Sequence, residues 1–467
     1  MGYELNDEAG GDCSDGAIGP ARRAVVPWMG TAVSETRATH ADGDHCREMA
    51  GKLRELARYT RLPGIRRELS DLAERYDRRG VHFDRAVSIV HGNGYAFDGI
   101  PTAFWPIGYP GFLALLFWSL PETPETGLIA NFFLAAITVT CSFRIYRELP
   151  ISNAFALFRI LVLTAFPNFI FYQNLLLSEM LMTAILSISL LALIVARRNY
   201  QFLATGVFFG LATLVKSQAL FLPLLPFIYD VWGHPAPKAV VHRYALLAAG
   251  MLLIIFPWSM RNYFVFDRFI LVQSNGGYNL LMGNNEHNRW GGSTGAAAEF
   301  AAMFPGIVED INRPLSDELG MNDRAAAMAV RFIVSNPVEA LKRVPYKVYR
   351  FFSHDPQGIR SLMRSNAAAG NNAVWLLSLF TLSFWYYTVV MMLAVLSWIV
   401  FFLLPLRSRA HFILLCTILY FAAILAAFYG EGRFHIPVLP AFVGCMLVTL
   451  QGMRLTLWPP RSPRTSI

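Results

Sequence analysis

Apolar and polar residues are separated into long blocks along this chain. Residues 1–100 are polar and charged, residues 103–260 and 374–453 are almost wholly apolar, and residues 261–373 are mixed. A helix needs about 20 mostly apolar residues to cross a bilayer, and its backbone groups must pair within the segment. The pattern therefore predicts an all-α polytopic membrane protein with a polar head and a polar insert.

Nine stretches of the apolar blocks are expected to cross the bilayer as helices. Two of them are short and are separated by Lys216. They form two transmembrane blocks, residues 127–260 and residues 374–453. The expected helices cover residues 127–145, 151–170, 175–196, 202–215, 217–232, 244–260, 374–403, 411–429 and 435–451.

Basic residues indicate the orientation of these helices. They follow every second stretch and end in residues 454–467, which are predicted to form a basic cytoplasmic tail. Residues 261–373, Lys216 and Gly430–Arg433 are then expected outside, with residues 261–373 as an extracytoplasmic loop domain. The basic residues are Arg144, Arg147, Arg197, Arg198, Lys238, Arg243, Arg407, Arg409, Arg454, Arg461 and Arg464.

The apolar run Phe104–Leu120 has two interpretations because it contains Pro106, Gly108 and Pro110. As a membrane span it would place the N-terminal head in the cytoplasm. As a short helix along the outer interface it would belong to a first outer loop at residues 81–126. We favour the interfacial helix.

The polar segments differ in their predicted structure. Residues 1–45 are rich in Gly, Ala, Asp and Thr and are predicted to be disordered. Residues 46–80 contain two amphipathic patterns and are predicted to form a helical hairpin for packing or self-association. The insert begins with Gly- and Asn-rich turns, and its later helical patterns cover Asp323–Ser335 and Pro337–Phe352.

Composition and motifs exclude several classes of function. The chain is 55% hydrophobic and 15% charged, against about 25% charged residues in soluble domains. Its net charge of +8 comes from loop residues and does not indicate nucleic-acid binding. The five cysteines lack metal or redox spacing, and a divalent metal ion stays open as a cofactor. Gly92-Asn93-Gly94 is predicted to be a turn.

Ionisable residues beside membrane helices are candidates for function. Glu179, Lys216, Arg261 and Arg433 all fall on the predicted outer side. Simpler roles are open for two of them: Glu179 can lie in a helix start that Ser178 caps, and Lys216 can extend to lipid headgroups. Together, a carboxylate and several cations suit an anionic lipid headgroup, with phosphate favoured.

Several motifs resemble those of one family of membrane enzymes. The first outer loop, at Gly92–Tyr95 and Pro101–Pro110, resembles that of GT-C glycosyltransferases. The nearest resemblance is to bacterial relatives of protein O-mannosyltransferases and aminoarabinose transferases, which are dolichyl-phosphate-mannose-protein mannosyltransferase-like. The resemblance covers roughly residues 81–451. The other matching segments are Ser178-Glu179, Leu211–Gln218, Pro257–Asn262, Gly276–Asn285 and Glu431–Pro440.

The resemblance implies a fold and an activity. The expected fold is a GT-C-like multi-helix transmembrane bundle in the bacterial inner membrane. The expected reaction transfers a hexosyl or pentosyl group from a polyprenyl-phosphate-linked donor to a lipid, glycan or protein acceptor on the outer face. The family places an acidic residue in the first outer loop, where it serves as base or orients the acceptor.

These expectations select the candidate site residues. Asp77 and Asp84 are the nearest carboxylates to the family's acidic position, and Glu179 is the third catalytic candidate. No metal ligand is assigned. The substrate-binding candidates are Tyr109, Lys216, Arg261, Asn262, Asn284, Asn285 and Arg433, with Lys216 and Arg433 as partners of the donor phosphate.

One departure from the family leaves alternatives open. The family begins with a transmembrane helix, and here the predicted hairpin at residues 46–76 takes its place. A catalytically inactive scaffold relative is therefore one alternative. A lipid or sugar flippase or transporter is the other, and it would require charged residues at mid-membrane in paired, broken helices.

Overall fold

The computed structural model describes residues 82–153, 156–233, 235–288, 291–292, 317–368 and 375–457. The predictions for the N-terminal head, including the helical hairpin and Asp77, fall outside the described residues. So does most of the predicted basic tail.

Six helices of the described part are long and apolar enough to cross a membrane. This confirms an all-α polytopic membrane protein. The six are α4 (Pro124–Arg147), α7 (Ser178–Val195), α10 (Pro237–Phe266), α16 (Trp375–Leu403), α17 (Arg409–Ala427) and α18 (Leu439–Leu457), which continues the 3₁₀ turn η3 (Gly432–Val438).

The other three expected spans differ from the prediction. The stretch 151–170 is not one helix, because Pro167 begins a second helix: α5 (Ala156–Thr164) precedes α6 (Pro167–Tyr172). The stretch 202–215 is α8 (Asn199–Val215), with 17 residues. The stretch 217–232 is divided into a 3₁₀ turn, η2 (Ser217–Ala219), and α9 (Leu224–Gly233).

The first outer loop contains a short helix, α3 (Gly108–Phe117), with 10 residues. At 1.5 Å per residue it is about 15 Å long and too short to cross a bilayer. Before it lie the helical residues 82–90 and a hairpin of β1 (Ala96–Phe97) and β2 (Ile100–Pro101). The predicted turn at Gly92-Asn93-Gly94 is confirmed, since both glycines have positive φ, +78° and +69°. The interfacial orientation of α3 stays a prediction.

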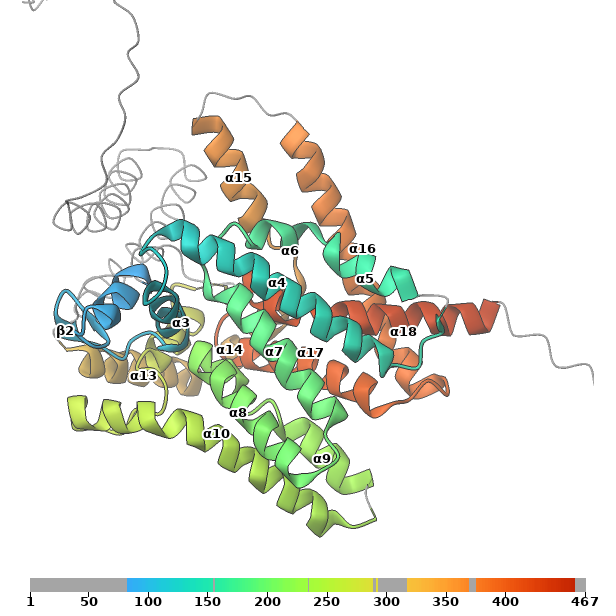
Figure 1. Cartoon of the computed structure of the whole chain (residues 1–467), viewed down its shortest axis with the longest axis horizontal. Helices are drawn as coiled ribbons and strands as arrows, with labels where there is room; N and C mark the ends of the chain where they lie inside the picture. Colours follow the sequence, from blue (N-terminus) through green and yellow to red (C-terminus); the bar gives the residue numbers. More distant parts are fainter. Residues whose placement is uncertain are drawn as a thin grey trace, which may run out of the picture.

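Helices α8 and α10 lie side by side in contact over much of their length (Figure 1). Glycines make this approach close: a Cβ atom at Gly206 would lie 1.9 Å from the Leu247 carbonyl oxygen. A Cβ atom at Gly250 would lie 2.2 Å from the Leu203 carbonyl oxygen. Small residues at such positions let helix backbones approach in membranes. The two helices are thereby held as a pair.

Four helices belong to the polar insert. They are α11 (Gly276–Gly283), α13 (Glu318–Ser335), α14 (Pro337–Phe352) and α15 (Gln357–Ala368). The bounds of α14 are those expected, α13 starts five residues earlier than expected, and α10 continues past residue 260 to Phe266. Figure 1 shows α13, β2 and the C-terminal end of α10 together at the left, opposite the C-terminal end of α18.

Candidate functional site

A cavity of about 660 Å³ lies where the ends of several elements meet. Its walls come from the starts of α7 and α11, the segment after α8, the loop after α10, the turn η3, and Trp105 to Tyr109 of the first outer loop. This volume is in the range of pockets that hold cofactors and small ligands. One wall carries charged side chains, and another carries carboxamides.

The charged wall brings together three residues that sequence reasoning selected. Lys216 Nζ lies 2.9 Å from Glu179 Oε1, and the Glu179 side chain is 4% exposed. Arg433 Nη2 lies 3.0 Å from Glu431 Oε2. The Lys216 ammonium and the Arg433 guanidinium both approach the Phe434 ring, at 5.6 and 5.2 Å from its centre. The two predicted phosphate partners therefore flank one aromatic ring.

The backbone explains why Lys216 reaches this place. Helix α8 ends at Val215, and Lys216 takes an extended conformation with φ −145° and ψ 116°. The start of α3 packs directly on this end: a Cβ atom at Gly108 would lie 2.5 Å from the Val215 nitrogen. Glycine at position 108 therefore lets the first outer loop approach Lys216.

The simpler roles are only partly supported: Glu179 does lie in the first turn of α7, but Ser178 does not cap that helix and Lys216 has a partner within the protein. The residue before α7 is Leu177, no side chain caps the helix, and Ser178 is its first helical residue. Lys216 does not extend to lipid headgroups, because its ammonium pairs with the buried Glu179 carboxylate. Removing one partner of such a pair leaves the other charge buried and unpaired.

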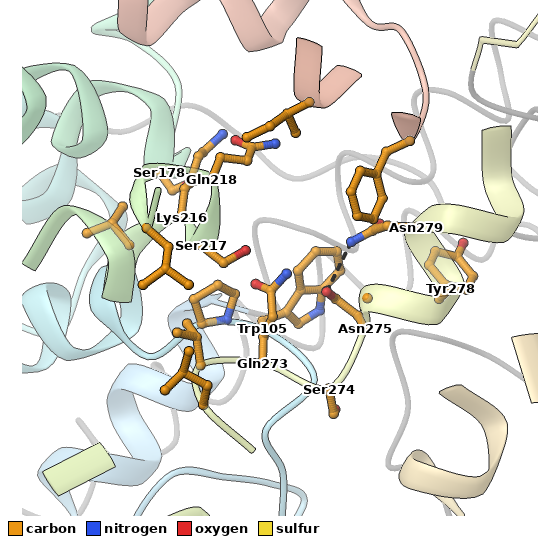
Figure 2. Close-up of a pocket in the computed structure, with 18 of the residues that line it drawn as sticks. Trp105, Ser178, Lys216, Ser217, Gln218, Gln273, Ser274, Asn275, Tyr278 and Asn279 are labelled. Atoms are coloured by element: carbon orange, nitrogen blue, oxygen red, sulfur yellow. Dashed lines mark hydrogen bonds between the residues drawn. The ribbon is translucent and has the colours of Figure 1, made fainter. Parts of the chain in front are cut away.

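The carboxamide wall comes mainly from the loop after α10 and the start of α11. Gln273, Asn275 and Asn279 line the cavity there, and Asn322 of α13 joins them. Asn279 Nδ2 donates to Asn275 Oδ1 at 3.0 Å, and Asn322 Oδ1 accepts from the Gly277 nitrogen at 2.6 Å. Figure 2 shows Gln273, Asn275 and Asn279 around the indole of Trp105.

Sequence reasoning identified the Gly- and Asn-rich stretch but selected other residues within it. Asn275 and Asn279 are four residues apart at the start of a helix, which places them on one face. That spacing was the available signal. Asn284 and Asn285 instead form hydrogen bonds to the backbone. Asn284 Nδ2 donates to the Ala427 oxygen, and Asn285 Nδ2 donates to the Leu281 oxygen.

Arg261 and Asn262 lie behind the cavity. Arg261 donates to the Thr102 oxygen at 2.9 Å and the Tyr95 oxygen at 2.8 Å, and Asn262 Nδ2 donates to the Ile270 oxygen at 3.1 Å. These bonds join α10 to the first outer loop and to the loop after α10. The structure does not bring these two predicted residues to the cavity, whereas predicted Tyr109 lines it with Trp105 and Tyr278.

The predicted catalytic carboxylates are placed differently from one another. Glu179 lines the cavity, Asp84 lies half-buried in the helical residues 82–90 without lining it, and Asp77 is outside the described residues. His82, two residues before Asp84, does line the cavity. Burial lowers the pKa of the neighbouring Arg85, while Tyr95, Asp84 and Glu318 oppose that shift.

Glu318 is a buried carboxylate that sequence reasoning missed. It accepts hydrogen bonds from Thr102 Oγ1 at 2.6 Å, from the Ala103 nitrogen at 3.0 Å and from Ser274 Oγ. The first outer loop and the loop after α10 are thereby joined at one side chain. Its partners lie far away in sequence, so no local pattern marks it.

Among the described residues, no group of three or more His, Cys, Asp or Glu is arranged to hold a metal ion. The cavity itself presents cations, carboxylates and carboxamides.

Comparisons with known proteins found two solved structures and one family model. No curated protein matches the chain. Two crystal structures of ArnT from Cupriavidus metallidurans are distantly similar. The apo state is 14% identical over 80% of this chain and 72% of that chain, with a TM-score of 0.35. The state bound to undecaprenyl phosphate is 12% identical over 90% and 77%, with a TM-score of 0.34.

A family model provides the more direct comparison. Residues 109–260 match the model of the dolichyl-phosphate-mannose-protein mannosyltransferase family. This range includes Tyr109, Glu179 and Lys216 of the cavity. Over these residues, which are less than half of the chain, the sequence is similar to the dolichyl-phosphate-mannose-protein mannosyltransferase family, in agreement with the predicted resemblance to GT-C membrane glycosyltransferases.

Proposed function

We propose that this protein transfers a sugar from a polyprenyl-phosphate-linked donor to a lipid, glycan or protein acceptor. The reaction takes place on the outer face of the bacterial inner membrane. The observation that carries the proposal is the meeting of Lys216 and Arg433 around Phe434 in one cavity, with Glu179 beside them. The matched family's name, which specifies a dolichyl-phosphate-linked sugar, supports the same class of donor.

The cations suit the charge that develops in such a reaction. The acceptor oxygen or nitrogen loses its proton to a base and forms a bond to the anomeric carbon. The bond between that carbon and the phosphate oxygen breaks, and its electron pair leaves with the polyprenyl phosphate. Lys216 and Arg433 stabilise this negative charge.

The base is assigned to Asp77 or Asp84, as the resemblance implies. Glu179 then keeps Lys216 in place, because the two side chains form a pair at 2.9 Å. A carboxylate in that role lowers the cost of burying the cation when the donor is absent.

The test is the binding of polyprenyl phosphate by the purified full chain in detergent. Arg433→Met should weaken binding about ten- to a hundredfold, because a charge-assisted contact contributes ~1.5–3 kcal/mol. The double variant Glu179→Gln, Lys216→Met should do the same without leaving a buried charge unpaired.

Two controls separate this effect from a general loss of charge or fold. Arg331→Met removes an exposed cation from α13, and Lys342→Met removes an exposed cation from α14. Both should bind polyprenyl phosphate as tightly as the unmodified chain. Unchanged affinity in Arg433→Met and in the double variant would contradict the proposal.

A further inference from the structure

We propose that the carboxamide wall is a subsite for an uncharged sugar. Its members are Gln273, Asn275, Asn279 and Asn322, with Trp105 beside them. The inference rests on the proposed function, because it names the class of sugar that the same donor carries. A hexose or pentose bearing neither an amine nor a carboxylate is the ligand that these side chains suit.

The carboxamides have unused hydrogen-bonding capacity. Within the described part of the chain, the Gln273 side chain forms no hydrogen bond, and Asn275 and Asn279 use one polar atom each to bond to each other. Each carboxamide offers two N–H donors and an accepting oxygen, and each sugar hydroxyl both donates and accepts. Asn275 is only 1% exposed and lines the cavity, so its remaining donors can meet a ligand only there.

Trp105 adds an aromatic surface with one donor. Its Nε1 is buried and has no hydrogen-bond partner among the described residues. Phe104 and Trp105 pack edge to face, with ring centres 5.2 Å apart, which holds the indole in position. An indole with an apolar face and one N–H suits a ligand that is apolar on one side and hydroxylated at its edge.

The charges of the cavity argue against a charged sugar. Its two carboxylates among the described residues are already paired: Glu179 with Lys216 at 2.9 Å, and Asp323 with Arg268 at 2.7 Å. Arg268 and Asp323 are also more than half exposed. Lys216 and Arg433 are assigned to the donor phosphate, and the four carboxamides of the wall carry no charge. An ammonium or carboxylate on a sugar at this wall would therefore gain no counter-charge from the side chains that hold it.

The experiment compares four ligands at pH 7 on the purified full chain in detergent. They are polyprenyl phosphate alone and its conjugates with a neutral hexose, an amino pentose and a uronic acid. The neutral conjugate should bind at least tenfold more tightly than either charged conjugate. Gln273→Met and Asn279→Leu should each weaken the neutral conjugate about tenfold and leave the affinity for polyprenyl phosphate alone unchanged.

Asn199→Leu provides the matched control, because this exposed amide starts α8 away from the cavity. It should leave all four affinities unchanged. Equal binding of neutral and charged conjugates, or unchanged binding of the neutral conjugate in both variants, would overturn the sugar subsite. If the polyprenyl phosphate affinity is normal in that case, the proposed phosphate site still stands. Absence of binding by polyprenyl phosphate itself would overturn both proposals.

Discussion

Two lysines of this protein, one half-buried and one buried, are stabilised in different ways. Lys216 has a carboxylate partner in Glu179. Lys347 is 1% exposed and has no carboxylate partner among the described residues; it donates to Asn284 Oδ1 at 2.8 Å instead. Burial, with a smaller effect from Arg343, lowers the pKa of Lys347 to about 8. Because their surroundings differ, substitution of each lysine should have a different effect on stability.

The titration of Lys347 should make the stability of the protein depend on pH. Its folded-state pKa is depressed from 10.5 to about 8, so the unfolded chain binds more protons between these values. Stability should rise across that window as the folded state loses the proton. At pH 7 the burial of this charge costs about 3 kcal/mol, so Lys347→Met should raise the apparent unfolding temperature.

The difference in unfolding temperature between Lys347→Met and the unmodified chain should become smaller as the pH approaches 10. Thermal unfolding in detergent from pH 7 to 10 measures this trend. Lys342→Met changes an exposed lysine of the same helix and should show no such trend. Parallel pH profiles for Lys347→Met and the unmodified chain would contradict the prediction.

A double-mutant cycle should show that Glu179 and Lys216 stabilise the protein as a pair. Lys216→Met leaves the buried carboxylate without its cation and should cost ~3–5 kcal/mol. Adding Glu179→Gln should recover most of that loss, because the carboxamide is neutral. The free energy of unfolding in denaturant is the measurement, and additive effects of the two changes would rule out the coupling.

At the scale of elements, the sequence predicted some helix ends and missed others. Pro337 begins α14 as expected, and Trp375–Leu403 matches the expected span within one residue. The break between α5 and α6 was missed because the apolar run continues through Pro167. Hydrophobicity along the sequence predicts how long an apolar segment is. The point at which a helix breaks inside such a segment depends on whether its backbone N–H and C=O groups find hydrogen-bond partners outside the helix.

The contact between α8 and α10 should be sensitive to a single methyl group. Gly206→Ala places a Cβ atom where the Leu247 oxygen now lies, so the helices must separate. We expect a loss of about 1–3 kcal/mol and weaker binding of polyprenyl phosphate, since α8 positions Lys216. Gly233→Ala, at the open end of α9, is the control because nothing lies within 4 Å of its added methyl group. A stable, fully binding Gly206→Ala would refute this account.

For the whole molecule, the sequence predicted that functional residues gather on one side of the membrane. It identified only some of the residues that line the cavity. Glu179, Lys216 and Arg433 were selected because charges beside apolar helices are costly. Gln273, Asn275 and Trp105 carry no such cost and lie far from one another in sequence, so their meeting depends on the tertiary fold. The N-terminal candidate Asp77 lies outside the described residues.

The predicted orientation can be measured with an impermeant thiol reagent in intact cells, after the native cysteines are replaced. Glu286→Cys should react, because this exposed residue follows α11 in the predicted outer segment. Trp232→Cys, 89% exposed near the end of α9, should react only after lysis. The opposite pattern would invert the topology and with it the proposed site.

The close packing of α8 and α10 at their glycines also bears on which donors fit the cavity. Lys216 follows the end of α8, and Gln273 and Asn275 follow the end of α10, so two rods in direct backbone contact present the charged wall and the carboxamide wall. The packing of the two helices therefore fixes the two ends from which these walls begin. Donors would therefore differ in affinity according to the distance between their phosphate and their sugar hydroxyl groups. The ring size and the anomeric configuration of the sugar both change this distance, so both would affect binding.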